Sequence, residues 1–260
     1  MKTALLLSGW PRFHAEFDEQ LSNLKGSDID WIVVLWQNYP QDVDFTLNAC
    51  LTPSWTSRVE TEQDARAWLR ERMPPGHNLA HFSYRDWNDF PPYMIGDYAN
   101  QGPGTNPEAI FRQYWMLKQA NEASKQTAPY DLVIRSRQDL GVATEMPLDQ
   151  IHQELLADPM RIVTPSNHRQ GYQQSFNDQF AIGLPSAIDI YAGAVDYFNE
   201  FYFQKGVVMH PENIISHVIH AQGLHWNATE CVVNLRTRGR YLTPHFVRGQ
   251  RYYEPDFGRW

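Results

Sequence analysis

Three charged residues, Arg135, Arg137 and Asp139, directly follow an apolar run of the chain. A guanidinium group offers a planar fork of donors that fits phosphate oxygens, and a carboxylate beside arginines stays ionised. An ionised carboxylate near a diphosphate suits a hard divalent cation such as Mg²⁺ or Mn²⁺, because these ions prefer oxygen ligands. The residues therefore indicate a diphosphate site, and an ion-pair network at a strand end is the structural alternative.

A second polar group, formed by Ser8, Gly9 and Arg12, follows the first apolar run. Gly9 permits close approach of the backbone to a ligand. Ser8 offers a hydrogen bond, and Arg12 offers donors for a phosphate or carboxylate. The alternative is an ordinary turn between a strand and a helix, with a solvated arginine.

Two further carboxylates are candidates for acid–base chemistry. Asp178 follows a polar loop and begins an expected strand, where it would serve as a general base or simply cap a turn. Glu212 occupies the first turn of a helix that begins at Pro211. It would act as a base or bind a hydroxyl group, or it is merely an acid favoured at that helix end. His210, just before this helix, is placed to contact a ligand at the same helix end.

The elements that must position these residues are predicted from apolar patterns. Continuous apolar runs alternate along the chain with segments whose apolar residues recur at helical spacing. This order favours a parallel sheet covered by helices on both faces. Strands are expected over Thr3 to Leu7, Trp31 to Trp36, Asn78 to Tyr84, Tyr130 to Ile134, Met160 to Thr164 and Asp178 to Gly183. Helices are expected over Phe13 to Leu24, Glu62 to Met73, Glu108 to Lys125, Leu148 to Ala157, Ser186 to Phe201 and Pro211 to Gln222. Ligands collect at the carboxyl ends of such strands, so the first two polar groups are expected there.

Composition narrows the class of protein. The chain has 260 residues with a formal net charge of −8, which argues against a broad phosphate footprint on nucleic acid. Its two cysteines are too few for a disulfide framework. This low cysteine count indicates a reduced, cytoplasmic setting. No apolar run is long enough to span a bilayer. A Gly-x-Ser-x-Gly elbow is absent, which speaks against an α/β hydrolase.

Several short motifs, taken in order, resemble a family of bacterial and phage polysaccharide glycosyltransferases with a GT-A-type fold. They are Leu5 to Arg12, Trp31 to Trp36, Phe111 to Asn121, Tyr130 to Asp139, Asn177 to Gly183 and His210-Pro211-Glu212. Each motif is weak alone, but the ordered set covers residues 1 to about 220. The resemblance implies a single GT-A-like, Rossmann-like α/β domain over residues 1–260. Residues 1–140 would form its nucleotide-sugar-binding half and residues 141–260 its acceptor-side half.

The resemblance also implies an activity, the transfer of a sugar from a nucleotide-diphospho-sugar donor to a hydroxyl acceptor. Asp178 or Glu212 would then serve the acceptor, as a base or by binding a sugar hydroxyl, and His210 would contact the leaving phosphate. Asp139 would stand where the family's acidic metal-binding motif lies, but Arg137 replaces the first of its two acids. Mn²⁺ or Mg²⁺ is therefore optional, because Arg135 and Arg137 can themselves neutralise a diphosphate. The acceptor would be a surface glycan or, in a phage, a hydroxymethylated DNA base. A binding module that keeps the fold without catalysis is the alternative.

Overall fold

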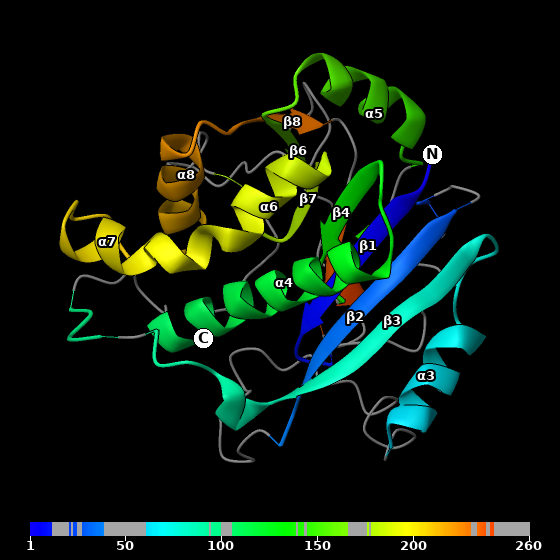
Figure 1. Ribbon diagram of the computed structural model, residues 1–260, viewed down its shortest axis with the longest axis horizontal. Coiled ribbons are helices and arrows are strands. Elements are labelled where there is room, and N and C mark those ends of the chain that lie inside the picture. The colour runs from blue at the N-terminus through cyan, green and yellow to red at the C-terminus, as the bar shows by residue number, and fades with distance from the viewer. Residues whose placement is uncertain are drawn as a thin grey trace.

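The computed structural model describes residues 1–11, 21, 23–24, 28–38, 61–93, 95–99, 106–138, 140–142, 145–165, 176, 178–229, 233–237 and 240–241. A seven-stranded sheet with the order β3-β2-β1-β4-β7-β6-β8 forms the centre of this part (Figure 1). Its strands are β1 (Thr3–Gly9), β2 (Ile29–Gln37), β3 (His77–Asp86), β4 (Leu132–Ser136), β6 (Arg161–Pro165), β7 (Phe180–Gly183) and β8 (His225–Thr229). A smaller sheet joins β5 (Leu140–Val142), β9 (Val233–Thr237) and β10 (Arg240–Tyr241).

The main sheet is mostly parallel. β1 pairs in parallel with β2 and β4, β2 with β3, and β6 with β8. β7 alone among these strands runs antiparallel to its neighbours, which are β4 and β6. The predicted α/β fold class, with a mostly parallel sheet in a single domain, is therefore confirmed.

Helices cover both faces of this sheet, as Figure 1 shows. They are α3 (Glu62–Glu71), α4 (Pro107–Thr127), α5 (Leu148–Ala157), α6 (Pro185–Gly193), α7 (Phe198–Phe203) and α8 (Pro211–Ala221), with short 3₁₀ helices η2 (Trp87–Asp89) and η3 (Ala194–Tyr197). Successive strand residues point to opposite faces. Leu6 accordingly packs with α4, α6, α7 and α8, whereas Leu5 and Leu7 pack with α3 and α5.

The helix α4 lies across one face of the sheet and supplies several residues to the candidate site. Its start follows from local chemistry, because Asn106 caps the Ala109 N–H and Pro107 occupies the first turn. A stripe of this helix is buried; its members are Ile110, Phe111, Tyr114, Leu117 and Asn121. This stripe anchors α4 against β1 and β2.

Three sequence predictions need correction or fall outside the described residues. The helix expected from Ser186 to Phe201 is divided into α6, η3 and α7, and the division falls at Gly193, a poor helix former. The strand expected from Asp178 begins at Phe180, so Asp178 lies in the preceding turn. The helix expected over residues 13–24 falls largely outside the described residues.

Within the described ranges, none of the helices has both the length and the apolar character needed to cross a bilayer. β4 from the first predicted half pairs with β7 from the second, and the two cores contain residues of both halves. The functional division near residue 140 stays a prediction.

Candidate functional site

The C-terminal end of β1 carries Ser8 and Gly9 of the second predicted polar group. Gly9 ends the strand with a φ of +105°, in the region that favours glycine. Gly9 is buried, yet a Cβ built on it would meet no atom of the described residues within 4 Å, so space remains beside the backbone in this part of the structure. Ser8 is partly exposed, and Arg12 lies outside the described residues.

The register of β1 and β4 brings the two predicted polar groups to one level of the sheet. Leu7 is paired with Ser136. In these parallel strands Ser8 follows Leu7 as Arg137 follows Ser136. Ser8, Gly9 and Arg137 therefore lie at the same edge of the sheet. This is the carboxyl end of two adjacent parallel strands, where ligands of open α/β sheets collect.

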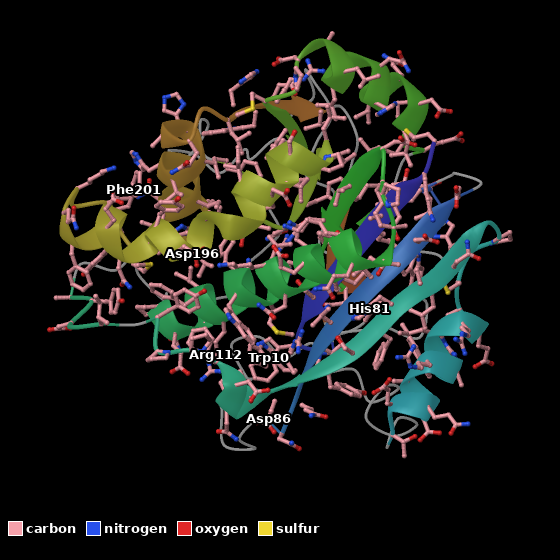
Figure 2. The ribbon with its side chains drawn as sticks, in the orientation of Figure 1. Trp10, His81, Asp86, Arg112, Asp196 and Phe201 are labelled. Carbon is pink, nitrogen blue, oxygen red and sulfur yellow. The ribbon has the colours of Figure 1, made fainter. Side chains whose placement is uncertain are left out.

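An aromatic cluster around Arg112 lies at the same edge, and sequence reasoning missed it. The Trp87 ring centroid lies 4.8 Å from that of Trp10 and 5.3 Å from that of Trp36. The Arg112 guanidinium lies 3.4 Å from the Trp87 centroid and 4.3 Å from that of Phe90. Figure 2 shows Trp10 and Arg112 close together near the ends of β1 and β3. Cation–π contacts stabilise such an arrangement, so the cluster holds the ends of β1, β2 and β3 together.

Arg135 lies inside the sheet rather than beyond a strand end, which corrects the sequence prediction. β4 continues to Ser136 and pairs Arg135 with Leu6 of β1 and Ala181 of β7. Arg135 is 4% exposed, and its Nη1 atom has no hydrogen-bond partner among the described residues. A buried guanidinium requires a nearby opposite charge, and Asp178 supplies one.

Arg137 lies just beyond the end of β4 and is partly exposed. Its backbone N–H donates to the carbonyl of Gln179 over 3.2 Å, which ties it to the turn before β7. Strand alternation would put Arg135, Arg137 and Asp139 on the same side only if the strand continued through them. β4 ends too early for that, and Asp139 lies outside the described residues.

Asp178, in the turn before β7, is only 5% exposed. Its Oδ2 atom accepts a 2.8 Å hydrogen bond from Gln113 Nε2 of α4. Burial raises the pKa of Asp178, and the charge of Glu212 raises it further, while Arg135, Arg137 and the Gln113 hydrogen bond oppose the rise. We call these four charged residues the charged cluster: Arg135, Arg137, Asp178 and Glu212.

Glu212 lies in the first turn of α8, where the positive end of the helix dipole favours a carboxylate. His210 stands just before the helix, and its Nδ1 atom lies 2.8 Å from Glu212 Oε2. The side chains of Glu212 and His210 are 15% and 24% exposed. Both side chains are partly exposed, although the facing atoms, His210 Nδ1 and Glu212 Oε2, are themselves buried.

Two buried tyrosines adjoin the charged cluster, and their proximity to it was not predicted. The ring centroids of Tyr114 on α4 and Tyr191 on α6 lie 6.0 Å apart. Burial raises the pKa of Tyr191 to about 12. Burial also raises the pKa of Tyr114, with added contributions from Tyr191 and the charge of Asp178. Both phenols are consequently neutral near pH 7.

The predicted metal site cannot be built from the described residues alone. Among them, no group of three or more His, Cys, Asp or Glu side chains lies close enough to hold a metal ion. The one predicted ligand, Asp139, is outside the described ranges. The charged cluster carries two arginines, which suit an anion better than a cation. The metal therefore stays a prediction.

Comparison with known proteins finds no matching family model and no matching curated protein. Among solved structures, the chain is similar to mouse xyloside xylosyltransferase 1 in its apo form, with 10% identity and a TM-score of 0.46 over 88% of this chain and 85% of that one. It is also similar to the glycosyltransferase GlyE of Streptococcus pneumoniae TIGR4, with 13% identity and a TM-score of 0.42 over 88% of this chain and 46% of that one. Such low values leave the activity of this chain to be argued from its own residues.

Proposed function

We propose that the protein is a GT-A-type glycosyltransferase that moves a sugar from a nucleotide-diphospho-sugar donor to a hydroxyl acceptor. The charged cluster is the observation that carries the proposal. It places two arginines and two carboxylates beside the carboxyl ends of β1 and β4. Transfer of a sugar from a diphosphate needs cationic groups for the leaving phosphates and a carboxylate for the acceptor.

The donor diphosphate would lie near Gly9 and Arg137. Space beside the Gly9 backbone permits close approach, and the partly exposed Arg137 offers a fork of donors to phosphate oxygens. Arg135 is too buried for direct contact, and it supports the site by its charge. Ser8 and Arg12 complete the proposed donor site on sequence grounds.

On the acceptor side, Asp178 or Glu212 would remove the hydroxyl proton as the acceptor oxygen bonds to the anomeric carbon. The bond from that carbon to the phosphate oxygen breaks, and its electron pair stays on the nucleoside diphosphate. A base in this role applies to an inverting enzyme. His210 stays a candidate for contact with the leaving phosphate through its Nε2 atom, since Nδ1 faces Glu212.

The acceptor class is proposed from charge and family resemblance. A surface glycan in polysaccharide biosynthesis is preferred, because a chain with net charge −8 is poorly suited to a broad contact with DNA. A hydroxymethylated DNA base, in a phage setting, would have to be presented out of the stack. Residues 1–140 would serve the donor and residues 141–260 the acceptor, in the cytoplasm.

A thermal-shift screen of nucleotide sugars, with and without Mn²⁺, tests the proposal. We expect at least one nucleotide sugar to raise the melting temperature, because a ligand that binds only the folded state stabilises it. Arg137→Gln should abolish the shift, whereas the exposed Arg70→Gln on α3 should keep it. Loss of the shift in Asp139→Ala, or without Mn²⁺, would support the metal role. If no nucleotide sugar stabilises the wild type, the donor site is wrong.

The alternative, a binding module without catalysis, keeps the same donor site. It predicts stabilisation by a nucleotide sugar without release of nucleoside diphosphate, even over long incubation with glycan acceptors. Slow hydrolysis of the donor, measured by coupled detection of the diphosphate, favours the enzyme.

A further inference from the structure

Arg135 places a charged side chain in the apolar layer between the sheet and the helices α4 and α6. Val133, two positions earlier on β4, belongs to the hydrophobic core on that side of the sheet. Leu6 and Ala181, which pair with Arg135 from the two neighbouring strands, belong to the same core. Residues two positions apart on a strand share a face. The guanidinium group of Arg135 is therefore directed towards α4 and α6.

Two phenols lie in the same layer. Tyr114 on α4 and Tyr191 on α6 are both 0% exposed and belong to the same core. Their ring centroids lie 6.0 Å apart with the rings nearly perpendicular, and α6 contacts both α4 and β4. The charge of Arg135 opposes the rise in the pKa of both phenols, so its side chain is near each of them. Three polar side chains from three elements thus share one buried region.

Each of these side chains has a buried polar atom that needs a partner. Among the described residues, Tyr114 Oη, Tyr191 Oη and Arg135 Nη1 make no hydrogen bond. The two hydroxyls are nevertheless close, because the Tyr114 hydroxyl also opposes the rise in the pKa of Tyr191. Buried polar atoms of native proteins are nearly always hydrogen-bonded to protein or ordered water, since an unpaired atom loses its hydration without compensation. One partner shared by all three atoms would meet this need.

We infer that one ordered water molecule binds between α4, α6 and β4 and bridges the three atoms. The water accepts a hydrogen bond from Arg135 Nη1, and it bonds to the two hydroxyls, each of which can donate or accept. Three hydrogen bonds are the usual number for a buried water. A neutral ligand suits the site better than an ion, because Arg135 disfavours a cation and the nearby carboxylates of Asp178 and Glu212 disfavour an anion. The water thereby links both helices to the sheet and holds the Arg135 guanidinium in place.

A crystal structure of the wild type, at a resolution that shows ordered water, tests the site directly. We expect a density peak about 2.7–3.2 Å from Tyr114 Oη, Tyr191 Oη and Arg135 Nη1. Direct hydrogen bonds among these atoms, with no peak between them, would overturn the inference. A bromide soak distinguishes water from an anion, and an anomalous peak at this position would overturn the inference as well.

Removal of single hydroxyls tests the bridge in solution. Tyr114→Phe and Tyr191→Phe keep the ring and delete only the oxygen, so each should lower the urea midpoint of unfolding. The double variant should lower the midpoint by clearly less than the sum of the two losses, because one water serves both hydroxyls. Tyr197→Phe is the matched control, since Tyr197 on η3 is exposed and its midpoint should not change. Additive losses, or no loss in either single variant, would contradict the bridge.

The water site does not depend on the proposed glycosyl transfer. Neither the crystal structure nor the unfolding series uses a nucleotide sugar or an acceptor, so both remain decisive if the protein transfers no sugar. Conversely, direct bonds between the phenols and Arg135 would remove the water site and leave the proposed donor site at Gly9 and Arg137 unchanged.

Discussion

Gln113 Nε2 on α4 donates a 2.8 Å hydrogen bond to Asp178 Oδ2, although the two residues stand 65 positions apart. The bond ties the helix that covers the sheet to the turn that carries Asp178 before β7. It also gives a buried carboxyl group a donor, which a buried polar group needs. The position of Asp178 in the charged cluster therefore depends on α4.

Loss of this donor should destabilise the protein. We expect Gln113→Leu to lower the free energy of unfolding by about 1–3 kcal/mol, because a buried acceptor is left without its partner. Urea denaturation checks the value. Gln150→Leu on α5 is the control, since Gln150 donates a hydrogen bond to Glu154 at an exposed position. Removal of this bond should lower the free energy of unfolding only slightly. Equal effects of the two substitutions would contradict the argument.

The glycine that ends β1 should be sensitive to substitution because of its backbone angle. Gly9→Ala should cost about 1 kcal/mol or more, since φ is +105° and L residues avoid that region. Gly193→Ala is the matched control, because that residue has helical angles and a Cβ there meets no atom within 4 Å. It should stabilise the protein by about 0.4–1 kcal/mol. Thermal unfolding of both variants gives the comparison.

His77 should make stability fall under acid conditions. Its Nδ1 accepts from Trp31 Nε1 over 2.9 Å, and its Nε2 lies 2.9 Å from the Leu24 carbonyl, which suits a neutral ring. Burial lowers the pKa of His77 below its ordinary value of 6.5. As pH falls, the unfolded chain therefore binds a proton at this residue before the folded protein does. The contribution of neutral His77 to the free energy of unfolding is complete above pH 6.5 and is lost as pH falls through the folded-state pKa.

His77→Gln tests this dependence, because an amide can supply one acceptor and one donor without titrating. The slope of unfolding free energy against pH, measured between pH 7 and 5, should be smaller in this variant. The exposed His220→Gln should keep the wild-type slope. A wild-type slope in His77→Gln would show that another group causes the acid sensitivity.

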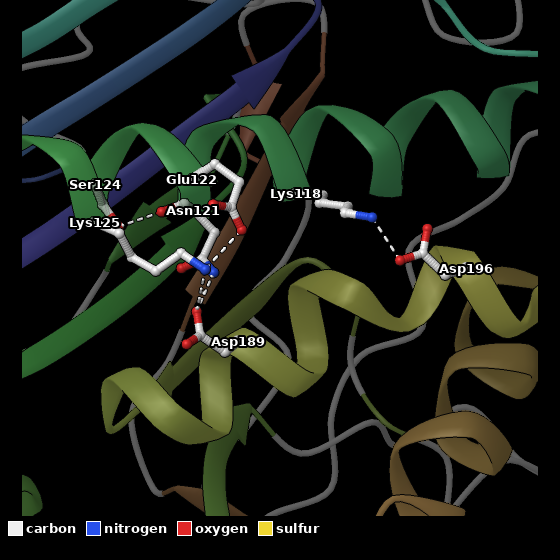
Figure 3. A network of polar contacts seen from close by, with 7 residues as sticks. All are labelled: Lys118, Asn121, Glu122, Ser124, Lys125, Asp189 and Asp196. Carbon is white, nitrogen blue, oxygen red and sulfur yellow. Dashed lines mark hydrogen bonds and ion pairs between the residues drawn. The ribbon is translucent and has the colours of Figure 1, made fainter.

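Figure 3 shows the polar contacts between α4 and the α6–η3 segment. We expect these contacts to contribute unequally to the free energy of unfolding. Lys118 pairs with Asp196, and Lys125 with Asp189, at partly exposed positions. Asn121 is 3% exposed and donates to Asp189 over 2.6 Å. Exposed ion pairs contribute about 0–1 kcal/mol and are screened by salt.

We therefore expect Lys118→Ala to change stability little, and less still at high salt. Asn121→Ala should cost about 1–3 kcal/mol at low and high salt alike, because it removes a mostly buried donor and its packing. Urea denaturation at two salt concentrations separates the effects. A larger cost for Lys118→Ala would contradict this ranking.

The sequence by itself determined the elements whose signals are local. Continuous apolar runs marked β1 and β2, because a strand buried on both faces has no polar alternation. Pro211 and the residues after it marked the start of α8, because proline fits the first turn of a helix. The fold class follows from the same alternation of strands and helices. The candidate residues Arg135, Asp178 and Glu212 were also found this way, from residue type and position.

Only the tertiary structure decided how these residues meet. The antiparallel insertion of β7 beside β4 brings Asp178 near Arg135, and strand pairing of this kind depends on contacts far apart in sequence. The same is true of the Gln113 bond and of Trp87, whose ring lies under Arg112. The burial of Arg135 also follows from its neighbours β1 and β7, not from its own strand. Local patterns fix which face a side chain takes, whereas the pairing of distant elements fixes which charges share a site.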